Sequence, residues 1–283
     1  MRLDIGKLKD RLLLNCQAAL KSPNFMPISI KLSILLIIPL VAYFQDFIQV
    51  FSLALSDSEA QYVLIVPFVA AYFFYRRRQV FYVSRKSSRL QDLTGISICL
   101  LALLMYVLGS YSFYALQLHL LSLPILIAGI TLLIFGADVL RLLLFPIALL
   151  FFISPFPLFI TDAWGGNLLT SDGALATAIL KPFIPLETTY QPIIIISTIT
   201  TAGAKIQFSL SAACSGIYSL TAFSFTAVVF GYLSSGSIFK KALFGIIAVI
   251  AAYFLNVFRI TATVVLGHFF GLGLATEFFH LVG

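Results

Sequence analysis

The sequence has few charged residues and very few histidines, cysteines and tryptophans. Only 10% of its 283 residues are charged, 60% are hydrophobic, and the mean hydropathy is +1.04. Charged residues make up about 25% of an ordinary soluble domain, so this composition excludes that class. Apolar runs long enough to cross a membrane predict helices, because a chain in a bilayer must satisfy its own backbone hydrogen bonds. The sequence therefore predicts an all-α polytopic membrane protein.

The scarcity of cysteine excludes several classes of site. The three cysteines, Cys16, Cys99 and Cys214, stand far apart and form no CxxC pair. Neither a disulfide framework, nor a thiolate metal site, nor a dithiol oxidoreductase is therefore expected. The motifs HExxH and GxSG are absent as well, which argues against the intramembrane proteases that carry them. We expect no metal and no cofactor.

Basic residues give the chain a net charge of +7, and they cluster between the apolar runs. They are not interleaved with aromatic residues on a polar surface, so we expect no nucleic-acid partner. The positive-inside rule places the basic segments 1–31 and 76–89 in the cytoplasm. Residues 1–31 are mildly amphipathic and lack the features of a signal peptide. The chain is therefore predicted in the cytoplasmic (inner) membrane with its N-terminus in the cytoplasm.

The apolar runs predict a bundle of about seven to eight transmembrane helices in a single integral membrane domain over residues 1–283. A last apolar piece, 269–283, is too short to cross a bilayer by itself. The predicted spans are 32–54, 61–76, 93–111, 117–136, 140–159, 210–233 and 242–267.

Residues 160–209 form a predicted extracytoplasmic insert between the fifth and sixth spans. The stretch LLTSDGALATAILKPF predicts a helix at the membrane interface. The residue pattern then changes from helical to strand-like. The stretch QPIIIISTITTAGAKIQFSL is rich in β-branched residues and contains Ala202 and Gly203 as turn residues. We expect a small β-hairpin at roughly 192–209, lying over the outer face.

Asn256 and Arg259 interrupt the last predicted span. An arginine at the centre of a spanning helix costs about 2.5–3.5 kcal/mol, so Arg259 should have a partner or a function. At about 100° per residue, Asn256, Arg259 and Thr263 share one side of the helix. This spacing predicts a polar stripe that faces the bundle. The alternative is that Arg259 reaches out to the lipid headgroups.

Cys214 lies in LSAACSGIYSL, near the predicted outer surface and at about the depth of Arg259. A buried free cysteine is usually inert, so packing is its simplest role. A thiol becomes a nucleophile when a histidine, a cation or a helix N-terminus lowers its pKa, and candidates for all three are present. Gly216 would allow a close backbone approach to the reacting group.

Two histidines could serve Cys214 as a base. His280 has Glu277 one turn before it, and this carboxylate could orient the ring. His268 follows Arg259 by nine residues, which turns it to the opposite side of a continuous helix unless Gly267 breaks that helix. His119, near the outer start of the fourth span, is interpreted as structural.

Three strings occur in order near the end of the chain: AACSGIYSL, then NVFRI 42 residues after Cys214, then TEFFHLVG. Together with FPIALLFFISPFP and a short span ending in YRRR, they resemble the exosortase/archaeosortase family of membrane transpeptidases over roughly residues 60–283. The resemblance implies catalytic roles for Cys214, Arg259 and His280. The possible supporting residues are Asn256, Ser215, Gly216, Glu277 and His268.

The resemblance also implies a substrate, namely a secreted protein whose C-terminal sorting signal joins a short motif, a transmembrane helix and a basic tail. We expect a cysteine peptidase in which Cys214 attacks the scissile carbonyl and forms a thioester, while His280 protonates the leaving amine. Arg259 would hold the oxyanion or the substrate backbone. The expected partners are such substrates and membrane lipid.

Two other functions fit the sequence less well. A transporter could bind an anionic solute through Arg259 and Asn256, but the other spans are nearly featureless. A scaffold for envelope assembly would use Cys214 only as packing material.

Overall fold

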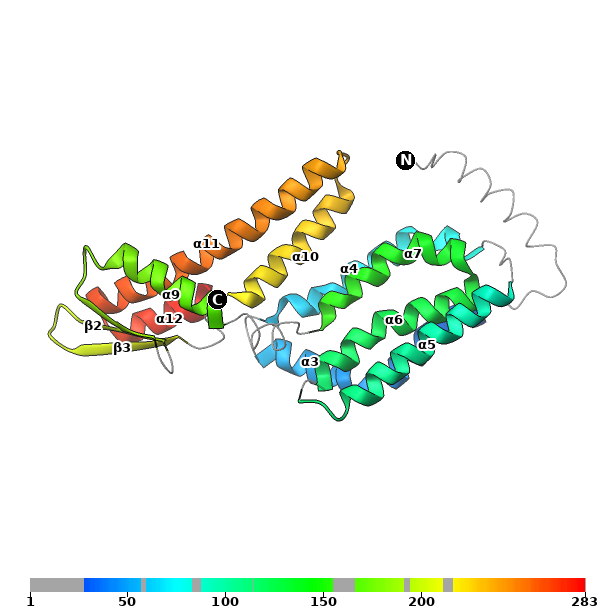
Figure 1. The fold of residues 1–283 in the computed structure, drawn as a ribbon, viewed down its shortest axis with the longest axis horizontal. Coiled ribbons are helices and arrows are strands. Elements are labelled where there is room, and N and C mark those ends of the chain that lie inside the picture. The colour runs from blue at the N-terminus through cyan, green and yellow to red at the C-terminus, as the bar shows by residue number, and fades with distance from the viewer. Residues whose placement is uncertain are drawn as a thin grey trace. The chain divides into compact units, whose positions relative to one another are not determined.

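The computed structural model describes residues 28–56, 60–82, 88–113, 115–154, 166–190, 194–210 and 216–282. These residues belong to two compact units: unit 1 lies within residues 1–53 and 63–155, and unit 2 within residues 54–62 and 156–283. Helices dominate both units, and a small sheet lies in unit 2 (Figure 1). Each unit contains a helix long enough to cross a membrane. The single integral membrane domain over residues 1–283 remains a prediction.

Unit 1 is built from helices that follow one another along the chain. Its buried core lies between α2, η2, α6 and α7 and includes Leu35, Phe81, Phe135 and Leu143. Its elements are α2 (Ile28–Ala42), α3 (Phe44–Ser56, whose last three residues fall in unit 2), α4 (Tyr62–Arg76), the 3-10 helix η2 (Arg78–Tyr82), α5 (Arg89–Gly109), α6 (Ala115–Phe135), α7 (Ala137–Leu149) and the 3-10 helix η3 (Leu150–Ile153).

Helices α5 and α6 run side by side in unit 1 (Figure 1). Gly129 of α6 faces Cys99 of α5, and a Cβ added at this glycine would lie 2.6 Å from the Cys99 Sγ. Small residues allow neighbouring membrane helices to approach closely. The partly buried Cys99 thus packs in a close helix contact.

The first predicted span, 32–54, is two helices rather than one. α2 and α3 meet at Tyr43, and the bend between them is 68°. Pro39 lies one turn before the bend and has no N–H to donate to the helix ladder. The Tyr43 hydroxyl lies 2.5 Å from the Ser122 hydroxyl of α6. The predicted span is therefore bent, because a proline and polar side chains interrupt the apolar run.

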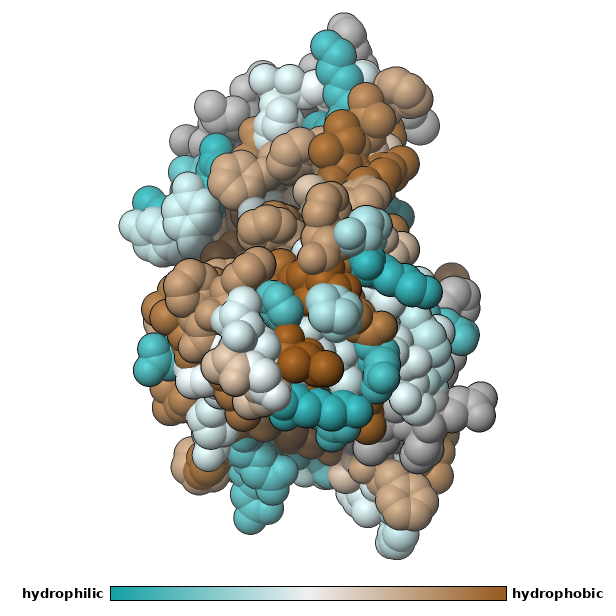
Figure 2. Space-filling view, turned by 90° about the vertical axis from the view of Figure 1, so that its left-hand side faces the viewer, coloured by the Kyte–Doolittle hydropathy of each residue, from teal (hydrophilic) through white to brown (hydrophobic). Residues whose placement is uncertain are grey.

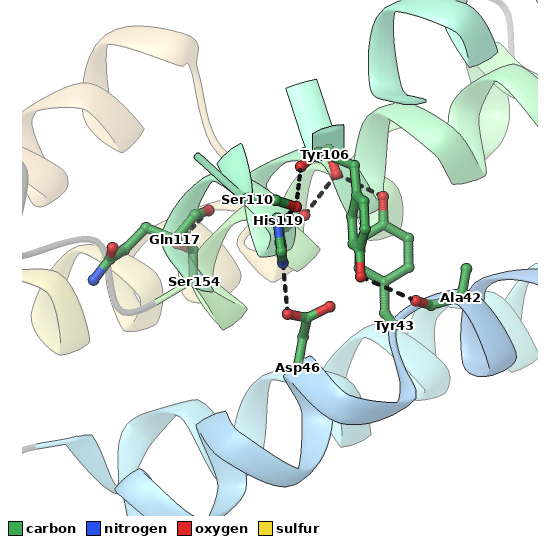
Figure 3. A network of polar contacts seen from close by, with 9 residues as sticks. Ala42, Tyr43, Asp46, Tyr106, Ser110, Gln117, His119 and Ser154 are labelled. Atoms are coloured by element: carbon green, nitrogen blue, oxygen red, sulfur yellow. Dashed lines mark hydrogen bonds and ion pairs between the residues drawn. The ribbon is translucent and has the colours of Figure 1, made fainter. Parts of the chain in front are cut away.

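A polar network ties the start of α3 to α5 and α6 (Figure 3). Oδ1 of the buried Asp46 lies 2.8 Å from Nδ1 of His119, and the other ring nitrogen lies 3.0 Å from the Ser110 hydroxyl. The imidazole also stacks on the Tyr106 ring, with centroids 3.9 Å apart. These contacts agree with the structural role interpreted for His119.

Unit 2 contains the candidate site. α9 packs against α11, and α10 and α12 flank α11 along its length. The long helix α11 includes the whole predicted span 242–267. The elements are α9 (Gly166–Leu180), β1 (Leu186–Thr189), β2 (Ile194–Ile199), β3 (Lys205–Leu210), α10 (Ile217–Leu233), α11 (Ile238–Phe270) and α12 (Leu272–Val282).

The predicted β-hairpin is confirmed. β2 and β3 pair antiparallel, from Ile194 opposite Leu210 to Ile199 opposite Lys205. Gly203 closes the turn with a φ of 84°, a left-handed conformation that glycine adopts readily. A third strand, β1, adds to the outer side of β2, giving the order β1-β2-β3. The sequence analysis did not predict β1.

The sheet lies on α9 and α11. Their shared core includes Ala176 and Leu180 of α9, Ile196 of β2 and Ile260 of α11. The opposite surface mixes polar and apolar side chains, and an exposed ion pair there joins Lys205 to a glutamate of β1 at 3.2 Å. Figure 2, which faces the end of the molecule where the sheet lies, shows hydrophilic residues interspersed with hydrophobic ones.

Three described helices are long and apolar enough to cross a membrane: α5, α6 and α11. The bent pair α2–α3 is a fourth candidate, and α4 and α10 are shorter apolar helices. A multi-pass helical membrane protein is therefore supported, while the number seven to eight stays a prediction. α10 begins at Ile217, so the sixth span does not start at residue 210 as expected. Its first expected residue, Leu210, ends β3 instead.

Candidate active site

The polar stripe predicted on the last span faces inward. Asn256, Arg259 and Thr263 lie on α11, and their exposed fractions are 5%, 3% and 7%. The Thr263 hydroxyl donates to the Arg259 carbonyl of its own helix at 2.8 Å. Because only 3% of Arg259 is exposed, its side chain points into the protein, and this burial argues against the alternative in which it reaches out to headgroups.

Asp172 of α9 is the main partner of this stripe, and the sequence analysis missed it. The side chain is completely buried, and its Oδ2 accepts a hydrogen bond from Nδ2 of Asn256 at 2.8 Å. Among the described residues, its Oδ1 has no hydrogen-bond partner. The hydroxyls of Ser171 and Tyr253, 3.2 Å apart, lie beside it and tie α9 to α11. A buried carboxylate thus meets a buried amide within reach of the arginine's charge.

Burial raises the pKa of Asp172 from 3.8 to about 6, because water is excluded from the carboxylate. The hydrogen bonds from Asn256 and Tyr253 and the charge of Arg259 act in the opposite direction and favour the ionised form. The carboxylate therefore keeps its charge at neutral pH and gains a proton in mildly acidic solution.

Gly216 brings the start of α10 against this cluster. It occupies the N-cap position of α10 with a φ of 67°. A Cβ added there would lie 2.5 Å from Cγ of Asn256 and 2.8 Å from its Nδ2. Both the left-handed backbone and the contact require glycine. Close backbone approach was predicted for Gly216, and the group it approaches is the amide of Asn256.

The short helix α12 folds back beside α11 and covers Arg259. The guanidinium carbon of Arg259 lies 4.7 Å from the centre of the Phe279 ring, a cation–π contact. His280 is the next residue in α12. Glu277 lies on the same helix and is exposed.

His268 is held by the sheet. Its Nδ1 lies 3.1 Å from the Thr198 hydroxyl of β2, and its carbonyl accepts from the Thr201 N–H at 3.1 Å. α11 continues through Gly267 to Phe270, so no break turns His268 toward Arg259. These contacts give His268 a place in the packing of the hairpin.

Two of the predicted residues, Cys214 and Ser215, fall outside the described residues, as does the side chain of His280. The structure therefore leaves their catalytic roles as predictions. It brings together the four side chains of Asp172, Asn256, Arg259 and Phe279. Among the described residues, no three His, Cys, Asp or Glu side chains are arranged to hold a metal ion.

The cluster holds the positively charged guanidinium of Arg259 in a setting of low dielectric constant. The guanidinium of Arg259 carries donors suited to an oxyanion or to peptide carbonyls. Asp172 contributes a nearby negative charge, and Asn256, which donates a hydrogen bond to Asp172, lies close to the backbone of Gly216. Such preorganised donors stabilise the anion that develops in acyl transfer.

A comparison with protein families finds a match to the C-terminal four fifths of the chain. The family described as transmembrane exosortase matches residues 54–283, which include all of α9 to α12 and the sheet. No curated protein and no solved structure matches the chain.

Proposed function

The chain belongs to the transmembrane exosortase family, and from this premise we propose that it is a cysteine transpeptidase of the cytoplasmic membrane. Family membership implies a membrane transpeptidase that acts on secreted proteins with C-terminal sorting signals. The proposal adds the catalytic type, the residues, and an active site near the extracytoplasmic face.

One observation carries the proposal. Gly216, two residues after the proposed nucleophile, touches Asn256, and Phe279, directly before the proposed base, covers the Arg259 guanidinium. Two segments more than 60 residues apart in the sequence thus meet on one turn of α11. This convergence supports a site shared by a cysteine, an arginine and a histidine.

The proposed reaction has two acyl transfers. The Cys214 thiolate attacks the scissile carbonyl carbon, and the oxyanion that forms is held by Arg259. The carbon–nitrogen bond then breaks, the leaving amine takes a proton from His280, and a thioester remains on the enzyme. An acceptor nucleophile gives its proton to His280, attacks the thioester, and releases the thiolate.

Asp172 serves this reaction as a positioning residue. Its carboxylate holds the Asn256 amide, and its charge lies close enough to Arg259 to favour ionisation of the carboxylate. The buried guanidinium thereby keeps a nearby counter-charge. Glu277, Ser215 and His268 would act less directly, and the sheet contact of His268 favours His280 as the base.

The decisive experiment uses a secreted, epitope-tagged reporter that ends in the C-terminal sorting signal of a protein from the same cell. Cells that produce the wild-type chain should shorten the reporter, while cells with Cys214→Ala should accumulate it at full length. Cys99→Ala is the matched control, because Cys99 is packed against Gly129 in unit 1 and should be dispensable.

Normal shortening by a membrane-inserted Cys214→Ala variant would refute the proposal and favour a scaffold. A mass spectrum of the purified enzyme, incubated with reporter and little acceptor, should also contain the thioester adduct on Cys214.

A further inference from the structure

β3 is the edge strand of the sheet. It pairs with β2 on one side, and no strand in the described part of the chain pairs with its other side. An open edge presents unpaired N–H and C=O groups and is a template for another strand. β3 ends at Leu210, four residues before Cys214. The open edge therefore leads along the chain toward the proposed nucleophile.

The turn of the hairpin identifies the backbone groups that point to the open edge. The Thr200 N–H donates to the Ala204 carbonyl at 2.8 Å, so these two residues face each other as a hydrogen-bonded pair. Such pairs recur at every second position of an antiparallel ladder. The backbone groups of Lys205, Gln207 and Ser209 are therefore directed away from β2. Two of these residues line the cavity beside the strand.

That cavity has a volume of about 190 Å³ and follows the last four residues of β3. Its opposite wall consists of α11, with Thr263 and apolar neighbours, and α12, with Thr276 and Phe279. Successive side chains of a strand point to opposite faces of the sheet. Four consecutive residues can therefore line one groove when that groove runs along the edge of the strand. The wall of the groove is mostly apolar. Phe279 belongs both to this groove and to the Arg259 cluster, because the same ring covers the Arg259 guanidinium.

We propose that the peptide substrate binds here as an added strand, with its backbone hydrogen-bonded to Gln207 and Ser209. Strand addition obtains affinity from main-chain hydrogen bonds and specificity from pockets for alternate side chains. The groove would take an aliphatic or small aromatic side chain at every second position of an extended peptide. Cys214 is five positions after Ser209 in the sequence, a reach of at most about 18 Å. This inference rests on the proposed function and names how its substrate is held.

Proline substitutions test the hydrogen bonds directly. Gln207→Pro and Ser209→Pro each remove an outward N–H, and proline is tolerated on an edge strand whose N–H points away from the ladder. Cleavage of the reporter should slow by about tenfold or more, because one main-chain bond is lost and the ring obstructs the edge. Lys205→Pro is the matched control, since its N–H has the same direction but lies beyond the groove. It should cleave within about twofold of the wild type.

A second set of variants tests the groove without altering the strand. Thr276 is exposed on α12 and lines the cavity, so Thr276→Trp should fill it and slow cleavage by about tenfold. Leu274 is exposed on the same helix but does not line the cavity, so Leu274→Trp should cleave normally. Each purified variant is compared with the wild type by size-exclusion chromatography and thermal unfolding, which separates loss of binding from loss of fold.

The outcomes distinguish the two proposals. If Cys214→Ala blocks cleavage while well-folded Ser209→Pro and Thr276→Trp cleave normally, the strand-addition inference is wrong and the proposed function survives. If Cys214→Ala cleaves normally, the function itself fails. Equal loss of activity in Lys205→Pro and Ser209→Pro would also overturn the inference, because the effect would then not follow the groove.

Discussion

Replacing Asp172 with asparagine tests how the buried cluster works. The substitution keeps the shape of the side chain and an oxygen for the Asn256 amide, but it removes the negative charge near Arg259. Two effects are expected in opposite directions. The folded protein should become more stable at neutral pH, and the reporter should be cleaved more slowly.

The size of the stability effect follows from the raised pKa of Asp172. The difference between 3.8 and about 6, at about 1.4 kcal/mol per pH unit, sets an upper limit of roughly 3 kcal/mol on the net cost of keeping the carboxylate ionised in the folded state, and solvent screening lowers this figure. A raised pKa means that the folded state binds the proton more tightly than the unfolded state. The wild type therefore gains stability as the pH falls from above 6 toward 4, and loses it again as the pH rises. Asp172→Asn lacks this dependence.

The assay compares the two proteins in detergent or nanodiscs between pH 5 and pH 8. At pH 7.5 the variant should unfold at the higher temperature and should cleave the reporter about ten- to a hundredfold more slowly. Below pH 6 the wild-type carboxyl is protonated, so the two cleavage rates should converge. A rate ratio that is constant over the whole pH range would refute the idea that the charge of Asp172 acts on the site. A variant that is less stable at every pH would refute the burial argument.

Three further substitutions probe the neighbours of this cluster. Gly216→Ala should destabilise the protein by about 2 kcal/mol or more and abolish cleavage, because it strains a left-handed residue and crowds Asn256; thermal unfolding measures this, and Gly245→Ala, with open space around it, should be harmless. Arg259→Lys should lower the cleavage rate at least a hundredfold in the reporter assay, because an ammonium lacks the planar fork; cleavage within threefold of the wild type would contradict this. His268→Phe should cleave within about threefold while losing about 1 kcal/mol of stability, because its ring bonds to a hydroxyl of β2; a hundredfold loss would instead identify His268 as the base.

The features predicted correctly from the sequence depend on the spacing of residues over a short stretch and on the free-energy cost of burying a charged side chain. The inward polar stripe on α11 was predicted from the spacing of Asn256 and Arg259. A charged arginine in an apolar helix needs polar or charged partners, which the interior of a helix bundle can supply. The hairpin followed from a β-branched run with Gly203 at its turn. Both patterns are complete within about twenty residues of sequence.

The features that were missed depend on contacts between distant segments. Asp172 is one acidic residue in an apolar helix, and its partner Asn256 lies 84 residues away. A signal was present, since Asp172, Ala176 and Leu180 recur every four residues on one face, which placed the carboxylate on the buried side. The bend at Tyr43 also depends on long-range contacts, although Pro39 and Asp46 mark it locally. The strand β1 has only four residues, too few for its alternation to be recognised.

The later start of α10 changes how Cys214 can be positioned. A helix from residue 210 would have placed the cysteine inside a regular turn, whereas α10 begins three residues after it. The described chain is fixed on both sides of the segment 211–215. On one side Leu210 pairs with Ile194 in the sheet, and on the other Gly216 rests on Asn256. In the sequence, the proposed nucleophile Cys214 therefore lies between two described elements, β3 and α10. A helix N-terminus such as that of α10 favours a thiolate close to it. Because Gly216 directly follows the segment that contains Cys214 and rests on Asn256, a methyl group at position 216 should disturb the proposed chemistry as much as the fold.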